Sequence, residues 1–465
     1  MKMNIKYIIL SLFFLPQVSV FSQSDSLMHY LEIATKNNPT VMQRYNEYEA
    51  ALQKVPQVGS LPDPQLDLGV YLSPMELIAG NQVADIKLMQ MFPWFGVLKN
   101  ATDEMSLMAK AKFETFRDAK LQVYYDVQRT WFDLYKVRQN IRISEKNVEL
   151  LKTIERLTLV QYKTGSIGGN IPQPSSGKAA VASSGSSGMN VMGGGSGSTS
   201  GASSASSQSG SMGSASGSSG LAGVYQIQIE LGDLENGIAT LKNEEQVIVA
   251  QFNSQLNRPL TATVYVPDSL AVEPLNISYL SVNDSMFTRN PMLTMIHYEQ
   301  QSLDARKRMQ KQMGFPMVGL GVNYSVINKS AMSTSPMNGQ DMIMPMITLT
   351  LPVYRKKYKA MQTETDFLKK ASEQNYRAAA NSLQTEYYEA LQLYYDAGRR
   401  MKLYQNQSRL AQKTLAISIK SFSSAASGLS DILRIRQQLQ DYELKEVEAV
   451  ADFNKAEAWV KRLTP

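Results

Sequence analysis

Methionine is the residue whose side chains offer this chain its most distinctive chemistry. The sequence holds 25 methionines, no cysteine and two histidines in 465 residues. A thioether sulfur is a soft, neutral ligand suited to Cu(I) and, by the same softness, to Ag(I). Some candidate soft-metal contacts alternate along extended stretches: Met89, Met91, Met317, Met342, Met344 and Met346. Others lie within a Ser/Gly-rich segment: Met189, Met192 and Met212. The alternative is that these flexible side chains fill gaps in packed interiors.

Other chemistries find little support in the residues. His29 and His297 both fall in predicted helices, where we expect a packing or surface role. We therefore do not expect imidazole to coordinate zinc, cobalt or nickel. No catalytic constellation or phosphate-binding loop is recognisable, and we expect no enzyme and no cofactor. The net charge of +6 is spread along the helices and does not indicate nucleic-acid binding.

The first residues are typical of a secretory signal peptide covering residues 1–22. Lys2 and Lys6 precede an apolar run, Tyr7–Leu15, and small residues follow up to Ser22. The run is too short for the alternative, a transmembrane anchor. We therefore expect an exported protein, and because no later stretch approaches about 20 apolar residues, any membrane crossing would use strands.

The chain also repeats itself in a consistent order. Matching residues lie 252 or 259 positions apart: Pro39 with Pro291, Gly69 with Gly321, and Pro93 with Pro352. Each match is weak alone, but their common order predicts two structural repeats. We place the first at 23–260, a connector at 261–275 and the second at 276–465.

Each repeat predicts long helices. One helix is expected over 26–55, ending before Pro56, and much longer ones over 97–162 and 354–421, where apolar residues recur at three- and four-residue spacing. Helices of this length, on the order of 100 Å, indicate coiled-coil packing. Their many aromatic rings are expected to pack between helices.

Four shorter segments alternate between apolar and polar or small residues, at about 64–72, 84–92, 317–326 and 341–351. In the first, Leu66, Leu68, Val70 and Leu72 share one face, and Asp67, Gly69 and Tyr71 share the other. This pattern is typical of transmembrane β-barrel strands, although an amphipathic sheet on a soluble core has it too. Since the smallest single-chain barrels have about eight strands, four strands would have to be shared among chains.

The order of these elements resembles the TolC family of outer-membrane efflux channels over essentially the whole exported chain. The segments "LPDPQL" and "QMFPWFG" are similar to its heavy-metal branch, and "GLSDILRIRQQL" (Gly428–Leu439) looks like its periplasmic hairpin tip. The resemblance implies a homotrimer with a twelve-stranded barrel in outer-membrane lipid, continued by an α-helical periplasmic tunnel. It also implies a periplasmic adaptor and an inner-membrane, proton-driven pump as partners.

The Ser/Gly/Met-rich segment is then an insertion at about 166–220. Tyr162 and Phe422 lie 260 residues apart, whereas Leu221 and Leu429 lie 208 apart, a difference of 52. The insertion therefore falls at the tip of the first-repeat hairpin, where extra chain costs little closure entropy. We expect a tether; adaptor contact or metal capture is the alternative.

The resemblance also implies where the tunnel narrows. Asp431 matches the acidic residues that line the family's tunnel mouth, and a ring of three carboxylates would attract cations. The alternative is that Asp431 only favours the start of its helix. Arg434 stands where a second acid is common and Gly223 is the first-repeat equivalent of Asp431, which argues against strong cation selection. Phe422 and Tyr162 are further mouth candidates.

A second group lies where strand is expected to become helix. These residues are Phe92, Pro93, Trp94, Phe95 and Gly96, with Pro352 in the second repeat. Aromatic rings favour the membrane interface, and proline would turn the chain between barrel and tunnel.

The sequence therefore predicts a passive efflux exit duct, with heavy metals of the copper and silver type as the favoured cargo. Export of drugs, dyes or proteins is the alternative within transport. A periplasmic coiled-coil scaffold without a pore is the alternative from another class.

Overall fold

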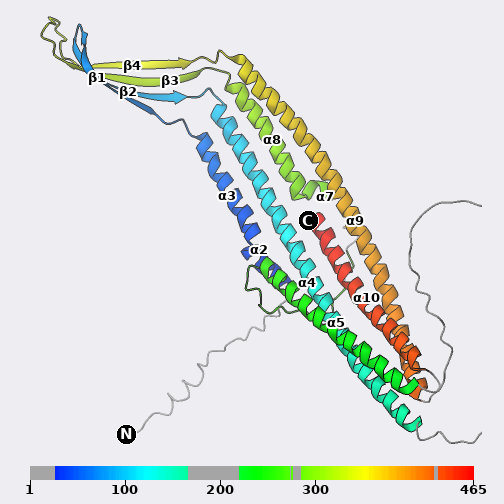
Figure 1. Ribbon diagram of the computed structural model, residues 1–465. Helices are drawn as coiled ribbons and strands as arrows, with labels where there is room; N and C mark the ends of the chain where they lie inside the picture. The colour runs from blue at the N-terminus through cyan, green and yellow to red at the C-terminus, as the bar shows by residue number, and fades with distance from the viewer. Residues whose placement is uncertain (1–26, 166–218, 273, 276–283, 424–427) are drawn as a thin grey trace, which may run out of the picture. The chain divides into compact units, whose positions relative to one another are not determined.

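The computed structural model describes residues 27–165, 219–272, 274–275, 284–423 and 428–465 (Figure 1). The elements run in the order α2 (Leu27–Asn37), α3 (Pro39–Gly59), β1 (Gln65–Leu77), β2 (Gly80–Phe92), α4 (Val97–Gly165), α5 (Ser219–Gln255), α7 (Asp284–Arg289), α8 (Pro291–Gln312), β3 (Met317–Asn328), β4 (Met342–Thr350), α9 (Arg355–Ser423) and α10 (Leu429–Leu463). The expected signal peptide lies outside the described residues, as does nearly all of the Ser/Gly-rich insertion.

The four strands form one antiparallel sheet in the order β1-β2-β3-β4 (Figure 1). All four expected strands are therefore confirmed, but two are longer than expected, because β1 continues to Leu77 and β2 already begins at Gly80. Pro74 lies where the register shifts between Val70 and Met75, so a residue that normally argues against a strand is accommodated in an irregularity.

The loops at the ends of the two strand pairs meet each other. The N–H of Gly339, in the β3–β4 loop, donates to the Ala79 carbonyl of the β1–β2 turn at 2.8 Å. Both loops need left-handed backbone, with φ of +127° at Gly80 and +80° at Gly339. Asn338 organises the longer loop by donating to the carbonyls of Ser330 and Ser333.

The long helices agree with the sequence, whereas the first helix does not. Helices α4 and α9 each contain 69 residues, close to the expected limits. The single helix expected over 26–55 is wrong: the Asn38 side chain accepts the Thr40 N–H at 2.9 Å, and a new helix starts at Pro39. That helix also continues past Pro56 to Gly59. Asn290 makes the equivalent cap before Pro291, with Met292 as donor.

None of the helices within the described ranges is both long enough and apolar enough to cross a bilayer.

The chain divides into two compact units that cut across the sequence repeats. Unit 1 consists of Met1–Asn140, Leu241–Asn406 and Tyr442–Pro465, and unit 2 of Ile141–Thr240 and Gln407–Asp441. Because β2 pairs with β3, one sheet takes strands from both expected repeats. The expected repeats are therefore not separate compact units.

Unit 1 holds the sheet and two hydrophobic clusters. One cluster is centred on Tyr30, Trp131 and Phe252, and the other on Tyr394 and Phe453. The expected connector, residues 261–275, is hydrogen-bonded to both clusters. The Tyr265 N–H donates to the Tyr30 hydroxyl and the Leu275 N–H donates to the Tyr394 hydroxyl, both at 3.0 Å. Arg138 adds a 2.8 Å hydrogen bond to the Val264 carbonyl.

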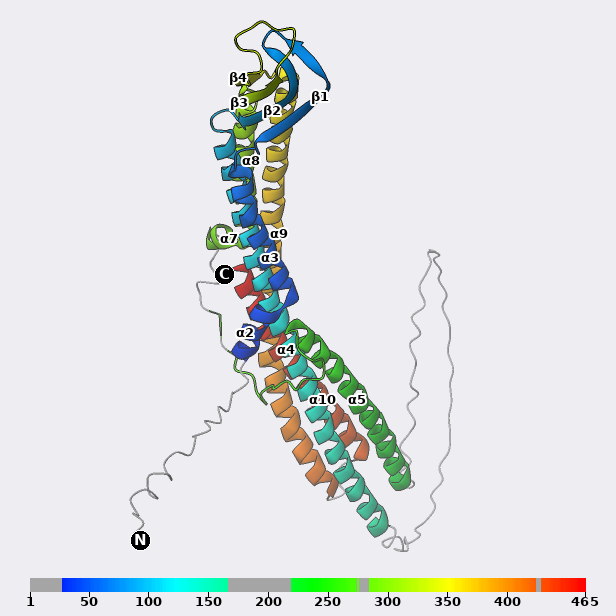
Figure 2. The same ribbon diagram turned by 90° about the vertical axis from the view of Figure 1, so that its left-hand side faces the viewer.

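Unit 2 consists of parts of α4, α5, α9 and α10, which lie side by side (Figure 2). Its core contains apolar side chains from all four helices, including Leu151, Ile227, Leu415 and Ile432. The helices therefore pack through apolar stripes, as their periodicity predicts.

Candidate functional site

The strand register places the methionines of β2, β3 and β4 on one face of the sheet. Successive rows across the sheet are Met91–Gly319–Thr348, Gln65–Met89–Gly321–Met346, Asp67–Lys87–Asn323–Met344 and Gly69–Asp85–Ser325–Met342, with Met317 opposite Thr350. We call this the methionine face. The alternation expected from sequence is confirmed where the strands pair, whereas Leu72 of β1 lies in the register shift between Val70 and Met75. Met189, Met192 and Met212 lie outside the described residues.

Glycines make room on this face for the side chains of the neighbouring strand. An ideal Cβ built on Gly319 would lie 2.6 Å from the Met91 sulfur and 3.4 Å from the Met89 sulfur. A Cβ on Gly321 would lie 2.7 Å from the Leu88 carbonyl oxygen. The Asp85 carboxylate similarly occupies the space above Gly69. Larger residues at these positions would displace either the methionine sulfurs or the neighbouring strand.

The opposite face of the sheet is apolar and uncovered in the single chain. Its exposed side chains are Leu66, Leu68, Val70, Leu72, Ile86, Leu88, Leu320, Val322, Ile343, Ile347 and Leu349. Leu72 is fully exposed and Ile347 is 78% exposed. A continuous apolar surface of this kind marks contact with lipid or with another apolar surface.

The strand-to-helix turn after β2 is ordered by Trp94 and Gly96. The Trp94 indole stacks on Phe315, with ring centroids 5.3 Å apart and planes inclined by 19°, whereas Phe95 is 86% exposed. Gly96 has a φ of +84°, and its carbonyl accepts the Asn100 N–H at the start of α4. Phe315 is a partner that the sequence did not indicate.

The remaining turn residues lie at the same end of the strands. Phe92 ends β2 with an exposed ring, Pro93 follows it, and Pro352 lies between β4 and α9. Beside Pro352, Leu351, Val353 and Tyr354 are all more than half exposed. Exposed aromatic and aliphatic side chains therefore lie at the ends of β2 and β4, as is typical of residues at a membrane interface.

At the tip of unit 2, Asp431 is paired rather than isolated. Its carboxylate lies 3.5 Å from the Arg434 guanidinium, one helical turn later, and both side chains are exposed. Asp431 also lies in the first turn of α10, where a carboxylate is favoured by the helix dipole. An exposed pair of this type contributes little stability, and its two charges offset each other's field.

The other tip candidates divide between core and surface. Phe422 is 6% exposed within the core of unit 2, and its carbonyl accepts a hydrogen bond from Gln161. Tyr162, its expected repeat equivalent, is 46% exposed. Packing explains why residue 223 is a glycine, because an added Cβ would lie 2.5 Å from the Leu429 side chain of α10. Among these residues, the structure leaves only the Tyr162 ring free to face solvent.

Arg436 is the tip residue that sequence reasoning missed. Its side chain is only 4% exposed and pairs with Glu230 of α5 at 2.7 Å, while Gln440 accepts a second hydrogen bond. Burial lowers the pKa of the Arg436 guanidinium, and Glu230 opposes that shift. Its spacing could have predicted this burial, because Arg436 lies on the same helix face as the buried residues Ile432 and Leu439.

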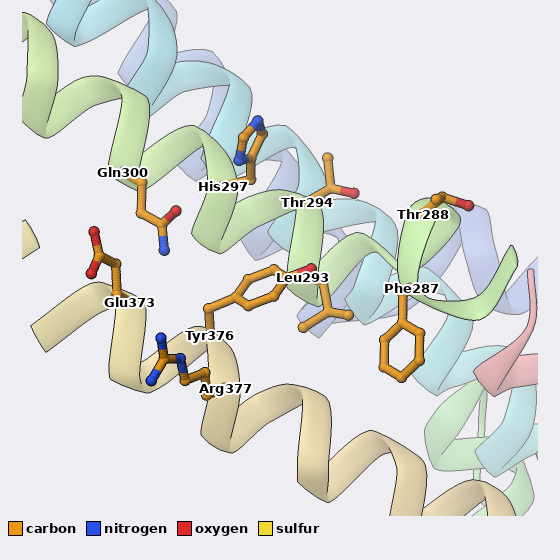
Figure 3. A pocket seen from close by; sticks show the side chains of 9 residues that line it. All are labelled: Phe287, Thr288, Leu293, Thr294, His297, Gln300, Glu373, Tyr376 and Arg377. Atoms are coloured by element: carbon orange, nitrogen blue, oxygen red, sulfur yellow. The ribbon is translucent and has the colours of Figure 1, made fainter. Parts of the chain in front are cut away.

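The two histidines lie on helices, as expected. His297 is exposed on α8, and one ring nitrogen lies 2.8 Å from the Gln301 amide. It borders a cleft of about 540 Å³ that Tyr376 and Arg377 also line, but Figure 3 shows its ring turned away from Glu373 and Arg377. In the described ranges, no group of three or more His, Cys, Asp and Glu side chains is arranged to hold a metal ion.

Neither the scan against protein-family models nor the search of curated proteins finds a match to this chain. Solved structures do match. The outer-membrane channel OprN aligns with a TM-score of 0.70 and 11% identity, over 94% of this chain and 89% of that one. The Vibrio cholerae outer membrane protein VceC gives 0.67 and 12%, over 94% and 96%. CusC, whose structures concern folding and transmembrane channel formation, gives 0.68 and 14%, over 94% and 91%.

These alignments cover nearly the whole chain and nearly the whole of each channel, including the sheet and the long helices. Identities of 11 to 14% do not favour one branch of channels over another. The strand register, the long helices and these similarities together show that this chain has the fold of outer-membrane channel proteins.

Proposed function

We propose that this chain is one subunit of a trimeric outer-membrane duct, the passive exit of a tripartite efflux system. The observation that carries the proposal is the sheet. One face is continuously apolar and exposed, the other carries polar, small and methionine side chains, and both β1 and β4 have a free edge among the described strands.

A four-stranded sheet with two free edges is not stable in lipid by itself, because each unpaired backbone group costs several kcal/mol there. Edge pairing between neighbouring copies satisfies these groups. Three copies would give a twelve-stranded barrel, with the apolar face toward lipid and the methionine face toward the lumen. The similar fold of OprN and CusC supports this assembly and an outer-membrane location.

The helices then continue the duct into the periplasm. In this arrangement the tip of unit 2, with Asp431 and Arg434, meets a periplasmic adaptor, and an inner-membrane pump supplies the driving force. The exposed Asp431–Arg434 pair supports a mouth with weak charge selection, because each carboxylate lies beside a guanidinium. Opening would therefore depend on the partners rather than on attraction of cations.

Copper- and silver-type metal ions are the favoured cargo. This preference is supported by thioethers on the methionine face and by the absence of cysteine from the sequence. Export of dyes, drugs or proteins through the same duct is the second candidate, because a wide lumen does not by itself select its cargo.

Reconstitution tests the duct directly. Full-length protein, extracted from outer membranes in detergent, should run as a heat-modifiable trimer and conduct ions in a planar bilayer. A matched variant, Leu68→Asp with Val322→Asp, places charge on the apolar face and should prevent membrane assembly. A periplasmic scaffold instead predicts release by urea washing, no conductance and no effect of these substitutions.

Growth of a deletion strain separates the cargoes. Sensitivity confined to silver and copper would support metal export, whereas sensitivity to dyes and antibiotics with normal metal tolerance would establish a general duct. A strain lacking only residues 175–220 tests the insertion in the same assay. A metal defect in that strain would assign a role to Met189, Met192 and Met212.

A further inference from the structure

Two methionines of β2 direct their sulfur atoms to the same point on the sheet. The sulfurs of Met91 and Met89 lie 2.6 and 3.4 Å from the position that a Cβ on Gly319 would occupy. The absence of a side chain at Gly319 therefore leaves a space that both thioethers border, together with the Thr348 Cβ at 3.3 Å. Any other residue there would occupy the space that the sulfurs now share.

A third thioether lies across the next glycine of β3, Gly321. Met89 is opposite Gly321 of β3, and Gly321 is opposite Met346 of β4. Adjacent strands are about 4.8 Å apart, so two long side chains separated by a glycine strand can approach each other. Met89 is only 5% exposed and Met346 is partly buried, so this part of the face is sheltered rather than fully solvated.

We propose that Met89, Met91 and Met346 form a thioether site for Cu(I) or Ag(I) on the methionine face. The inference rests on the proposed duct, whose lumen this face would line, and it names the chemistry of the cargo. Thioethers are neutral and soft, so they suit a monovalent soft cation and would not hold Mg²⁺ or Ca²⁺. No cysteine competes for such an ion, because the sequence contains none.

Packing alone does not account for the methionines that follow on β4. Met344 and Met342 continue the same face at two-residue steps of about 7 Å. They are 47% and 46% exposed, and Met337 and Met332 in the β3–β4 loop are 59% and 87% exposed. In the single chain, none of these four side chains is packed into a gap.

The exposed thioethers instead extend the site into a series of weak ligands. An ion held at Met89 and Met91 would have further sulfurs within one or two steps toward the β3–β4 loop. Conduction requires binding that is favourable enough to collect the ion yet weak and repeated enough to release it. Neutral thioethers at regular steps meet both requirements.

Silver binding to the full-length trimer in detergent tests the site. Equilibrium dialysis against silver nitrate in chloride-free buffer measures ions bound per chain, and X-ray absorption at the silver edge identifies sulfur ligands. The test variant is Met89→Leu with Met91→Leu, which keeps apolar volume and removes two sulfurs. The control is Met28→Leu with Met42→Leu, which removes two exposed thioethers from α2 and α3.

The expected result is that the test variant loses about one silver ion per chain with a sulfur-rich shell, while the control matches the unsubstituted protein. Gly319→Ala should weaken the same site although every sulfur is retained. Equal silver binding by the test variant and the control, or no binding to the unsubstituted protein, would overturn the proposal.

Trimer formation and bilayer conductance of each variant are measured in parallel. Unchanged silver binding in a conducting trimer would remove the metal site and leave the duct. A protein that binds silver through these methionines but neither trimerises nor conducts would remove the duct instead.

Discussion

The indole of Trp94 stacks on the ring of Phe315, with centroids 5.3 Å apart and planes 19° from parallel. Trp94 lies just after β2 and Phe315 just before β3, so the stack joins the end of one strand pair to the start of the next. The stack lies where the sheet connects to α4 and α8. The strand pairs β1–β2 and β3–β4 are therefore connected by a ring contact as well as by backbone pairing of β2 with β3.

Trp94→Ala should destabilise this junction by about 1–2 kcal/mol, because the stack and part of its apolar burial are lost. Denaturant unfolding of the purified protein, followed by circular dichroism, measures the change. Phe95→Ala is the matched control, since its ring is 86% exposed and should change stability by less than about 0.5 kcal/mol. Equal effects of the two substitutions would contradict a structural role for the stack.

Neighbouring residues on opposite faces of β4 should label differently in membranes. In the single chain Met344 is 47% exposed and Ile343 is 67% exposed. On exposure in the single chain alone, a cysteine at position 343 would therefore react at least as readily as one at position 344. In a barrel, Met344→Cys would face the aqueous lumen and react with a charged maleimide. Ile343→Cys would face lipid and remain unlabelled until detergent is added.

Asp67→Cys and Leu68→Cys provide a second pair on β1, in a chain with no native cysteine. Their labelling should follow the same rule. Reaction at all four positions in intact membranes would indicate a sheet that is not embedded in lipid.

Glu230→Ala should destabilise unit 2 by about 3 kcal/mol, because it leaves the buried Arg436 guanidinium without its ionic partner. Combining Glu230→Gln with Arg436→Met should recover most of that loss, since no uncompensated charge stays buried. Asp431→Ala is the control, as it breaks an exposed pair and should cost less than about 1 kcal/mol. Urea unfolding of each variant gives the three values.

Asp118→Asn should increase stability at neutral pH and not at low pH. Burial raises the pKa of Asp118, with the Arg462 charge opposing the shift. The folded chain therefore holds this proton more tightly than the unfolded chain, and stability is lost as pH rises from the ordinary aspartate range through the raised pKa. The asparagine variant has no such loss.

Unfolding midpoints between pH 3 and pH 8 check this prediction. Asp63→Asn, at an exposed position before β1, is the control substitution. A profile for Asp118→Asn that coincides with the unsubstituted protein would show that Asp118 is effectively solvated.

Local patterns in the sequence determined the four strands, the long helices and the division of the sheet into two faces. Strand alternation is a property of the backbone, so Leu68 and Asp67 had to point in opposite directions wherever the strand lay. The break at Asn38 was also readable in principle, because asparagine followed by proline is a helix-start signal. The break at Asn38 was not predicted, because the residues on both sides of it are compatible with one continuous helix.

Only the tertiary structure decided which residues meet. Met89 and Met91 are an alternating pair in sequence, but both sulfurs border the space above Gly319, which the register places opposite Met91. Phe422 reads as a mouth residue by repeat position, yet packing between α9 and its neighbours buries it. Arg436 reads as one of several arginines, and burial beside Glu230 makes it distinct. Periodicity specifies the face of each element, whereas partners across elements depend on register and helix packing, which no local pattern encodes.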